Sequence, residues 1–161
     1  MTDGDLLLRS GGLALRRAEP ADLEPLLTLQ RAAYAKNRPI LGVEPIPLLA
    51  DYTAIMRDME AWVSEKDGRI VAALILAPRA DDLLIWSVAT DPAAQGAGHG
   101  RALLAAAEVR AHQLGRGIVR LYTGTPLGHL VAWYGRHGYA VECIEALSDR
   151  SITHMIKHLG S

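Results

Sequence analysis

The fold is decided by the stretch 88–104, which reads VATDPAAQGAGHGRALL. An apolar strand expected over 83–89 enters a loop with three glycines, and the loop opens a helix expected over 101–114. Glycine has no Cβ, so the amide N–H groups of such a loop can crowd around an anion. The first amides of a helix have no partner within the helix, and the helix dipole adds positive character there. The stretch therefore predicts a phosphate-binding turn between a strand and a helix.

Three kinds of phosphate loop can be compared with this stretch. A Walker loop requires Gly-Lys-Ser/Thr, and the chain has no such triplet. A dinucleotide loop requires G-x-G-x-x-G early in the chain and an acid about 20 residues later. This loop has G-x-G-x-G after several strands, and no Asp or Glu lies between Val109 and Val141. The third pattern is Q/R-x-x-G-x-G/A, and Gln95, Gly98 and Gly100 satisfy it.

The sequence on either side of the loop predicts alternating strands and helices. Apolar and basic residues alternate over 13–17, which predicts a strand, and Pro20 among acids predicts a helix start. Three prolines predict a loop over 36–47, and Asp67-Gly68 between apolar runs predicts a hairpin. The expected order is strand 13–17, a helix to about 34, helix 48–59, strands 61–66, 69–77 and 83–89, helix 101–114, strand 118–123, helix 130–137, and strands 139–147 and 152–158.

Length and composition fit one ordinary domain. The chain has 161 residues, and we expect a flexible leader over 1–12 followed by a single domain over 13–161. A net charge of -1 gives no global basic footprint for nucleic acid or an anionic membrane. The longest apolar run, 70–77, is too short to span a bilayer. The single cysteine, Cys143, excludes an intrachain disulfide and is expected to be a buried, inert thiol. With a start unlike a signal peptide, these features predict a cytoplasmic protein.

A second motif lies further along, where residues 132–139 read AWYGRHGY. It sets Tyr134 four residues ahead of the Gly138-Tyr139 pair, and the chain ends in a strand-like HMIKHL over 154–159. With the glycine loop, and in this order, these features resemble the GNAT (GCN5-related) acetyltransferase superfamily over nearly the whole chain. The resemblance implies an α/β acyl-CoA N-acyltransferase fold. That fold has a mixed, mostly antiparallel sheet of about seven strands, flanking helices and a splayed central parallel pair.

The resemblance also implies a reaction and a co-substrate. The protein would bind acetyl-CoA and pass its acetyl group to a primary amine of a small molecule or peptide by direct attack. The pantetheine amides would meet the backbone of Val88 and Thr90, the pyrophosphate would meet amides from Gly96 to Arg101, and an N–H near Val88 would face the developing oxyanion. The expected cofactor-binding residues are Val88, Ala89, Thr90, Gln95, Gly96, Ala97, Gly98, His99, Gly100 and Arg101.

Tyr134 is the expected general acid. At the motif's position it would protonate the departing CoA thiolate, and a phenol is neutral and protonated at pH 7. The alternative role is packing of the helix against the sheet, which Trp133 and Tyr139 fill more naturally. The resemblance therefore assigns Tyr134 to catalysis.

The general base stays open at this level. Many relatives place a glutamate on the strand before the glycine loop, whereas this strand reads LLIWSV over 83–88, without a carboxylate. An acceptor that arrives partly deprotonated would need no base. Asp81 and Asp82 are expected to form a solvated turn. The candidates are Asp81, Asp82, Glu44, Glu60 or a water chain, with His129 a weaker one.

Two further departures from the family pattern leave an alternative open. Leu130 stands where many relatives carry an asparagine that contacts the cofactor, and Gly124 stands where a close subgroup carries another asparagine. The alternative is a catalytically weak acyl-CoA-binding or sensor module, and a nucleotide-dependent oxidoreductase is a third possibility. The six histidines show no metal-ligand spacing, so no metal site is expected. The loop 36–47 is expected to wall the acceptor site, and a homodimer is possible by analogy.

Overall fold

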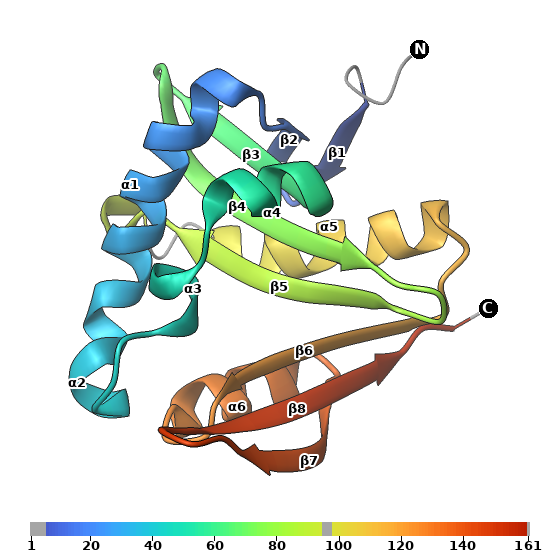
Figure 1. The fold of residues 1–161 in the computed structure, drawn as a ribbon. Helices are drawn as coiled ribbons and strands as arrows, with labels where there is room; N and C mark the ends of the chain where they lie inside the picture. The colour runs from blue at the N-terminus through green and yellow to red at the C-terminus, as the bar shows by residue number, and fades with distance from the viewer. Residues whose placement is uncertain (1–5, 95–97, 161) are drawn as a thin grey trace.

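The structure is a computed structural model that describes residues 6–94 and 98–160. Within them, one sheet of eight strands has helices on both faces (Figure 1). The strands are β1 (Leu7–Ser10), β2 (Leu13–Arg17), β3 (Glu60–Lys66), β4 (Arg69–Pro78), β5 (Leu83–Thr90), β6 (Ile118–Gly124), β7 (Ala140–Ala146) and β8 (Ser151–His158). The helices are α1 (Leu23–Tyr34), α2 (Arg38–Leu41), α3 (Ile46–Leu49), α4 (Tyr52–Asp58), α5 (His99–Gln113) and α6 (Gly128–Arg136), with 3-10 turns at Pro20–Asp22, Ala35–Asn37 and Pro92–Ala94.

The sheet has the order β1-β2-β3-β4-β5-β6-β8-β7. Every neighbouring pair is antiparallel except β5 and β6, which run parallel. The mixed, mostly antiparallel sheet that the resemblance implies is therefore confirmed, with eight strands in place of about seven. Among the described helices, none combines the length and the hydrophobicity needed to cross a bilayer.

The additional strand lies where the sequence predicts a flexible leader. β1 pairs antiparallel with β2, and Leu8 opposite Leu15 is fully buried. Gly11 and Gly12 turn the chain between the two strands, both with positive φ, which glycine adopts without steric cost. The leader expected over 1–12 is thus wrong for residues 7–10. A short run of leucines before a two-glycine turn is the signal that could have revealed this hairpin.

Two cores lie on opposite faces of the sheet because successive strand residues point to opposite sides. One core packs α5 against residues that include Trp62 and Leu74. The other packs α1 and α4 against residues that include Val63 and Ile75. In Figure 1, α1 accordingly lies in front of the sheet and α5 behind it.

The central parallel pair separates along its length. β5 pairs with β6 only from Leu83 to Ile85. At that point the β4–β5 register shifts, so that Trp86 has no partner on β4, and such a bulge bends and twists its strand. Beyond the bulge the two strands diverge towards their carboxyl ends (Figure 1), while β6 stays paired with β8 as far as Gly124. The splayed parallel pair is therefore confirmed, and the bulge gives its physical cause.

The proline-rich segment contains helix where the sequence predicts loop. Pro39 sits in the first turn of α2, where a missing N–H costs nothing, and Gly42 ends that helix with φ 73°. The helix expected over 48–59 is split into α3 and α4. A new helix begins after Asp51, which is the N-cap of α4 and accepts hydrogen bonds from the Thr53 and Ala54 amides.

Cys143 lies on β7, the edge strand of the sheet. All seven residues of β7 are exposed, and the cysteine is a free thiol. The expectation of a buried thiol is therefore wrong, because an apolar pattern in the sequence does not distinguish an edge strand from a central one.

Candidate functional site

A cavity of about 760 Å³ lies at the gap between the diverging strands β5 and β6. Residues 85–90 of β5 and 121–124 of β6 line it. From the α1 face it is lined by residues between Ala33 and Pro47, and from the α5 face by residues 98–101 and by α6. An extended ligand can therefore reach from one face of the sheet to the other through this gap.

The α5 end of the cavity is a helix N-terminus. Gly98 is the N-cap of α5, with φ 78° and no side-chain cap, so the first amides of the helix lack that partner. His99 has a buried Nδ1 with no hydrogen-bond partner among the described residues. Gly100 lies so close to α6 that a Cβ there would come within 3.1 Å of Trp133. Arg101 also lines the cavity, and this end offers unpaired donors and positive charge to an anion.

The expected site residues divide between two groups. Val88, Ala89 and Thr90 line the cavity together with Gly98 to Arg101. Gln95, Gly96 and Ala97 lie outside the described residues. After Ile85 the edge of β5 that faces β6 has no partner strand, so its backbone groups can pair with an extended ligand, as in strand addition.

A hydrogen-bonded network on the α1 side holds this part of β5, and the sequence reasoning missed it. The buried Gln30 Nε2 donates to Tyr52 Oη at 2.7 Å and to Ser87 Oγ at 3.0 Å. Tyr34 Oη donates its one proton to the Val88 carbonyl at 3.2 Å, so in the 2.8 Å hydrogen bond between Ser87 Oγ and Tyr34 Oη the serine is the donor. Burial raises the pKa of Tyr34, so this chain of donors stays protonated.

The network locks the strand that carries Val88. Its members come from α1, α4 and β5, which are distant in sequence. A polar Gln30 and a Tyr34 at i and i+4 on the otherwise apolar face of α1 are the signal that could have revealed it.

Tyr134 lines the cavity from α6. Its ring is edge-on to Trp133, with centroids 5.1 Å apart, and to Tyr139 at 6.1 Å. Burial raises the pKa of the Tyr134 phenol above its ordinary value. Within the chain that the structure describes, its hydroxyl has no hydrogen-bond partner, whereas Tyr34 is fully engaged. Tyr134 is thus a protonated donor that faces the cavity and is free to donate to a ligand.

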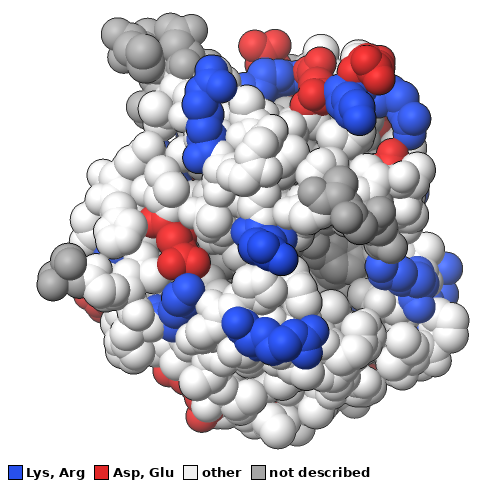
Figure 2. All heavy atoms as spheres, turned by 180° about the vertical axis from the view of Figure 1, so that it is seen from behind, with Lys and Arg blue, Asp and Glu red and all other residues white. Residues whose placement is uncertain are grey.

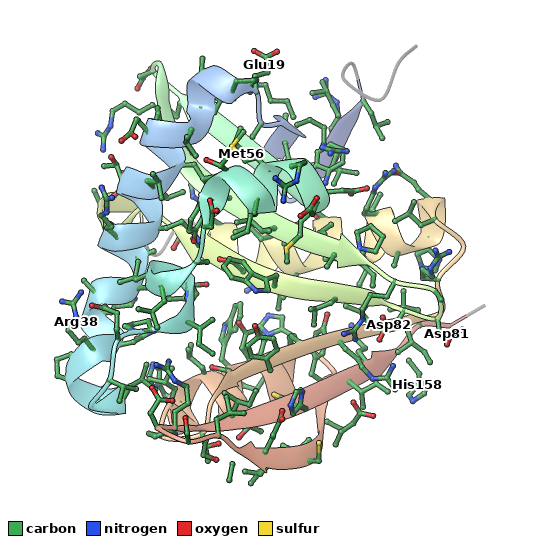
Figure 3. The ribbon with its side chains drawn as sticks, in the orientation of Figure 1. Glu19, Arg38, Met56, Asp81, Asp82 and His158 are labelled. Atoms are coloured by element: carbon green, nitrogen blue, oxygen red, sulfur yellow. The ribbon has the colours of Figure 1, made fainter. Side chains whose placement is uncertain are left out.

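None of the expected carboxylate bases lines the cavity. Asp82 is 3% exposed and pairs with Arg79 at 2.6 Å and Arg120 at 2.8 Å, so the expected solvated turn is wrong for this residue. The hydrogen bond from Arg79 lowers the pKa of Asp82. Figure 3 shows Asp81 and Asp82 at the β4–β5 turn, far from the α2 end that Arg38 marks.

The two glutamate candidates are also held elsewhere. Glu60 pairs with Arg110 at 2.8 Å and accepts a hydrogen bond from the Trp62 indole. Glu44 pairs with Arg38 at 2.8 Å. His129 does line the cavity. Across residues 6–94 and 98–160, the cavity wall contains no Asp or Glu.

The departures from the family pattern line the cavity as well. Leu130 faces it from α6 and Gly124 from the end of β6. A Cβ on Gly124 would overlap Leu41 Cδ2, so the glycine lets α2 lie close against β6. An asparagine at 124 would move the end of the Leu41 side chain.

The charge of the cavity wall is positive at both ends. Its described cationic side chains are Lys36, Arg101, Arg136 and Arg150. Figure 2, the view from behind, shows basic side chains spread over this face of the molecule, with acidic side chains at its upper edge and at its left. Such a surface attracts anionic ligands.

Comparisons with known proteins agree with this geometry. A family model described as an acetyltransferase (GNAT) domain matches residues 57–141. A GCN5-related N-acetyltransferase structure from Rhodopseudomonas palustris aligns with TM-score 0.74 and 18% identity over 97% of this chain and 100% of that chain. The ribosomal-protein-S18-alanine N-acetyltransferase of Escherichia coli aligns with TM-score 0.73 and 18% identity over 91% and 94%.

A third similar structure contains acetyl-CoA. A GNAT family acetyltransferase from Elizabethkingia anophelis, with acetyl-CoA bound, aligns with TM-score 0.69 and 14% identity over 90% of this chain and 97% of that chain. No match to this chain is found among curated proteins.

Proposed function

The chain belongs to the GNAT acetyltransferase family, and on that premise we propose that it transfers the acetyl group of acetyl-CoA to a primary amine of a small molecule or peptide by direct attack. The observation that supports this most is the cavity that passes through the sheet between β5 and β6, with the N-terminus of α5 at one end. A thioester held along β5 would then meet an amine that enters from the α1 face.

The described residues fit coenzyme A. Its pyrophosphate suits the uncapped start of α5, where the unpaired His99 Nδ1 and Arg101 also lie. Its pantetheine arm suits the free edge of β5, where Val88 and Thr90 can pair with amides. We include Gln95, Gly96 and Ala97 in the proposed pyrophosphate site on the basis of the motif alone.

The proposed chemistry gives each group one task. The amine nitrogen forms a bond to the acetyl carbon, and the bond from that carbon to sulfur breaks. The Val88 N–H is proposed to stabilise the charge that develops on the carbonyl oxygen. Tyr134 is proposed to give its proton to the departing thiolate, as a free, protonated donor can. The proton that the ammonium loses leaves before attack, to water or His129, since no described carboxylate faces the cavity.

Turnover tests the proposal. Purified protein with acetyl-CoA should release free CoA thiol only when a primary amine is present. Below the amine's own pKa, kcat/KM should rise about tenfold per pH unit, because only the neutral amine attacks and no cavity carboxylate assists it. The measurement is thiol release with a panel of amines across pH 6 to 9. Coenzyme A binding without amine-dependent release would instead support the acyl-CoA-binding module.

A further inference from the structure

We propose that the acceptor is a small primary amine that also carries a carboxylate, which Lys36 and Asn37 recognise on the α1 side of the cavity. The inference rests on the proposed function, because it names the substrate class of the same site. It starts from the charge of the described cavity wall, which includes cationic side chains and no carboxylate.

The cations at the two ends of the cavity face different partners. Arg101 lies at the start of α5, where the phosphates of coenzyme A would neutralise it. Arg150 already pairs with Asp149 at 3.1 Å and donates to the Glu44 carbonyl at 2.8 Å. Lys36 has no ion-pair or hydrogen-bond partner among the described residues. Arg136 also lacks such a partner, but it lies on α6, which packs with the α5 core near the phosphate end. Lys36 is therefore the unpaired cation on the α1 side of the described cavity wall.

Asn37 supplies a second and independent observation. The residue is only 5% exposed and lines the cavity. In the described part of the chain its side chain makes no hydrogen bond, and it does not cap α2. Polar side chains with so little exposure are usually hydrogen-bonded, so an amide that lines the cavity without a partner in the described chain points to a ligand. A carboxylate accepts from both the Asn37 amide and the Lys36 ammonium, and such charge-assisted bonds are strong.

The position of these two residues separates them from the phosphate end. Lys36 and Asn37 follow α1, which packs on one face of the sheet, whereas α5 packs on the other. An acceptor bound by its carboxylate on the α1 face would direct its amine towards the gap beside Val88. A dicationic amine would meet Lys36 without an acidic partner in the described wall, and like charges repel.

Matched acceptor pairs test the inference. Each pair is an α-amino acid and its carboxamide, with kcat/KM expressed per neutral amine at one pH. The wild-type protein should prefer the carboxylate about tenfold or more, and Lys36→Gln should remove most of that preference through a higher acceptor KM. The KM for acetyl-CoA should not change. Asn37→Asp, which keeps the shape and adds a negative charge, should reverse the preference.

The control is Lys66→Gln, because Lys66 is an exposed lysine of β3 outside the cavity, and its loss should leave the preference intact. Equal kcat/KM for acid and amide in the wild type, or a preference that Lys36→Gln leaves unchanged, would overturn the inference while acetyl transfer still stands. No transfer to any amine would overturn the proposed function and this inference with it.

Discussion

Replacing Tyr134 by phenylalanine is expected to lower kcat by about 10²–10⁴-fold, the usual contribution of a positioned proton donor. The hydroxyl is the group removed, and it faces the cavity with no partner in the described chain. The ring would remain edge-on to Trp133, so coenzyme A binding should be unchanged. Steady-state kinetics with acetyl-CoA and an active amine separates the two effects. We expect kcat to fall and the KM for acetyl-CoA to stay constant.

Tyr139→Phe is the matched control. Tyr139 belongs to the same aromatic group, and its buried hydroxyl has no hydrogen-bond partner among the described residues, so its removal should leave kcat near the wild-type value. Since burial raises the pKa of Tyr134, its ionisation should not cause a fall in rate up to about pH 10. A Tyr134→Phe protein with full kcat would show that the residue only packs α6 against the sheet.

Replacing Glu60 by alanine is expected to lower the free energy of unfolding by about 3–5 kcal/mol. Glu60 and Arg110 are 12% and 10% exposed in their side chains, and two hydrogen bonds of 2.8 and 2.9 Å join them. Glu60 also accepts from the Trp62 indole at 3.0 Å. The substitution removes the carboxylate that accepts from the Arg110 guanidinium and the Trp62 indole, and so leaves two buried donors without this acceptor. Urea denaturation followed by fluorescence measures the change.

Glu142→Ala provides the comparison at an exposed site. Glu142 also makes two hydrogen bonds to an arginine, Arg120, but its side chain is 32% exposed, so the expected cost is about 1 kcal/mol or less. If Glu60→Ala lowered the free energy of unfolding no more than Glu142→Ala does, our assignment of a structural and not a catalytic role to Glu60 would be contradicted.

The pH dependence of stability gives Glu60 a second test. Burial alone raises the pKa of Glu60, but hydrogen bonds from Arg110 and Trp62 outweigh it, and the net pKa is lowered. A lowered pKa stabilises the folded state above the unfolded pKa, which is about 4.3, and this contribution is lost as the pH falls through the folded value. The stability difference between wild type and Glu60→Ala should therefore be full at pH 6 and shrink below about pH 4.

The sequence predicted the parts of the fold that local chemistry determines. The strand before the glycine loop, the helix after it and the turn at Asp67-Gly68 all depend on residues next to one another, and the structure has each of them. The divergence of β5 and β6 was expected only from the family resemblance. Its cause, the bulge at Trp86, depends on how β4 pairs with β5, which no local pattern encodes.

The misses in the site have the same origin. Asp82 is an acid beside another acid, typical of an exposed turn, yet Arg120 reaches it from a strand 38 positions later. Asn37 and Lys36 stood in a segment expected to be an acceptor loop, but only the folded chain shows one of them buried without a partner. Ion pairs between distant segments and the burial of a side chain depend on the tertiary structure, so patterns of adjacent residues do not reveal them.

Isothermal titration calorimetry of the purified protein with acetyl-CoA tests the central claim most directly, namely that the gap between β5 and β6 and the start of α5 form an acetyl-CoA site. We expect saturable binding at one site per chain in the concentration range of typical KM values, about 1 µM to 1 mM. Arg101→Ala should weaken the binding, and NAD should give no heat in a parallel titration. An absence of binding to both coenzyme A and acetyl-CoA at millimolar concentration would contradict the account.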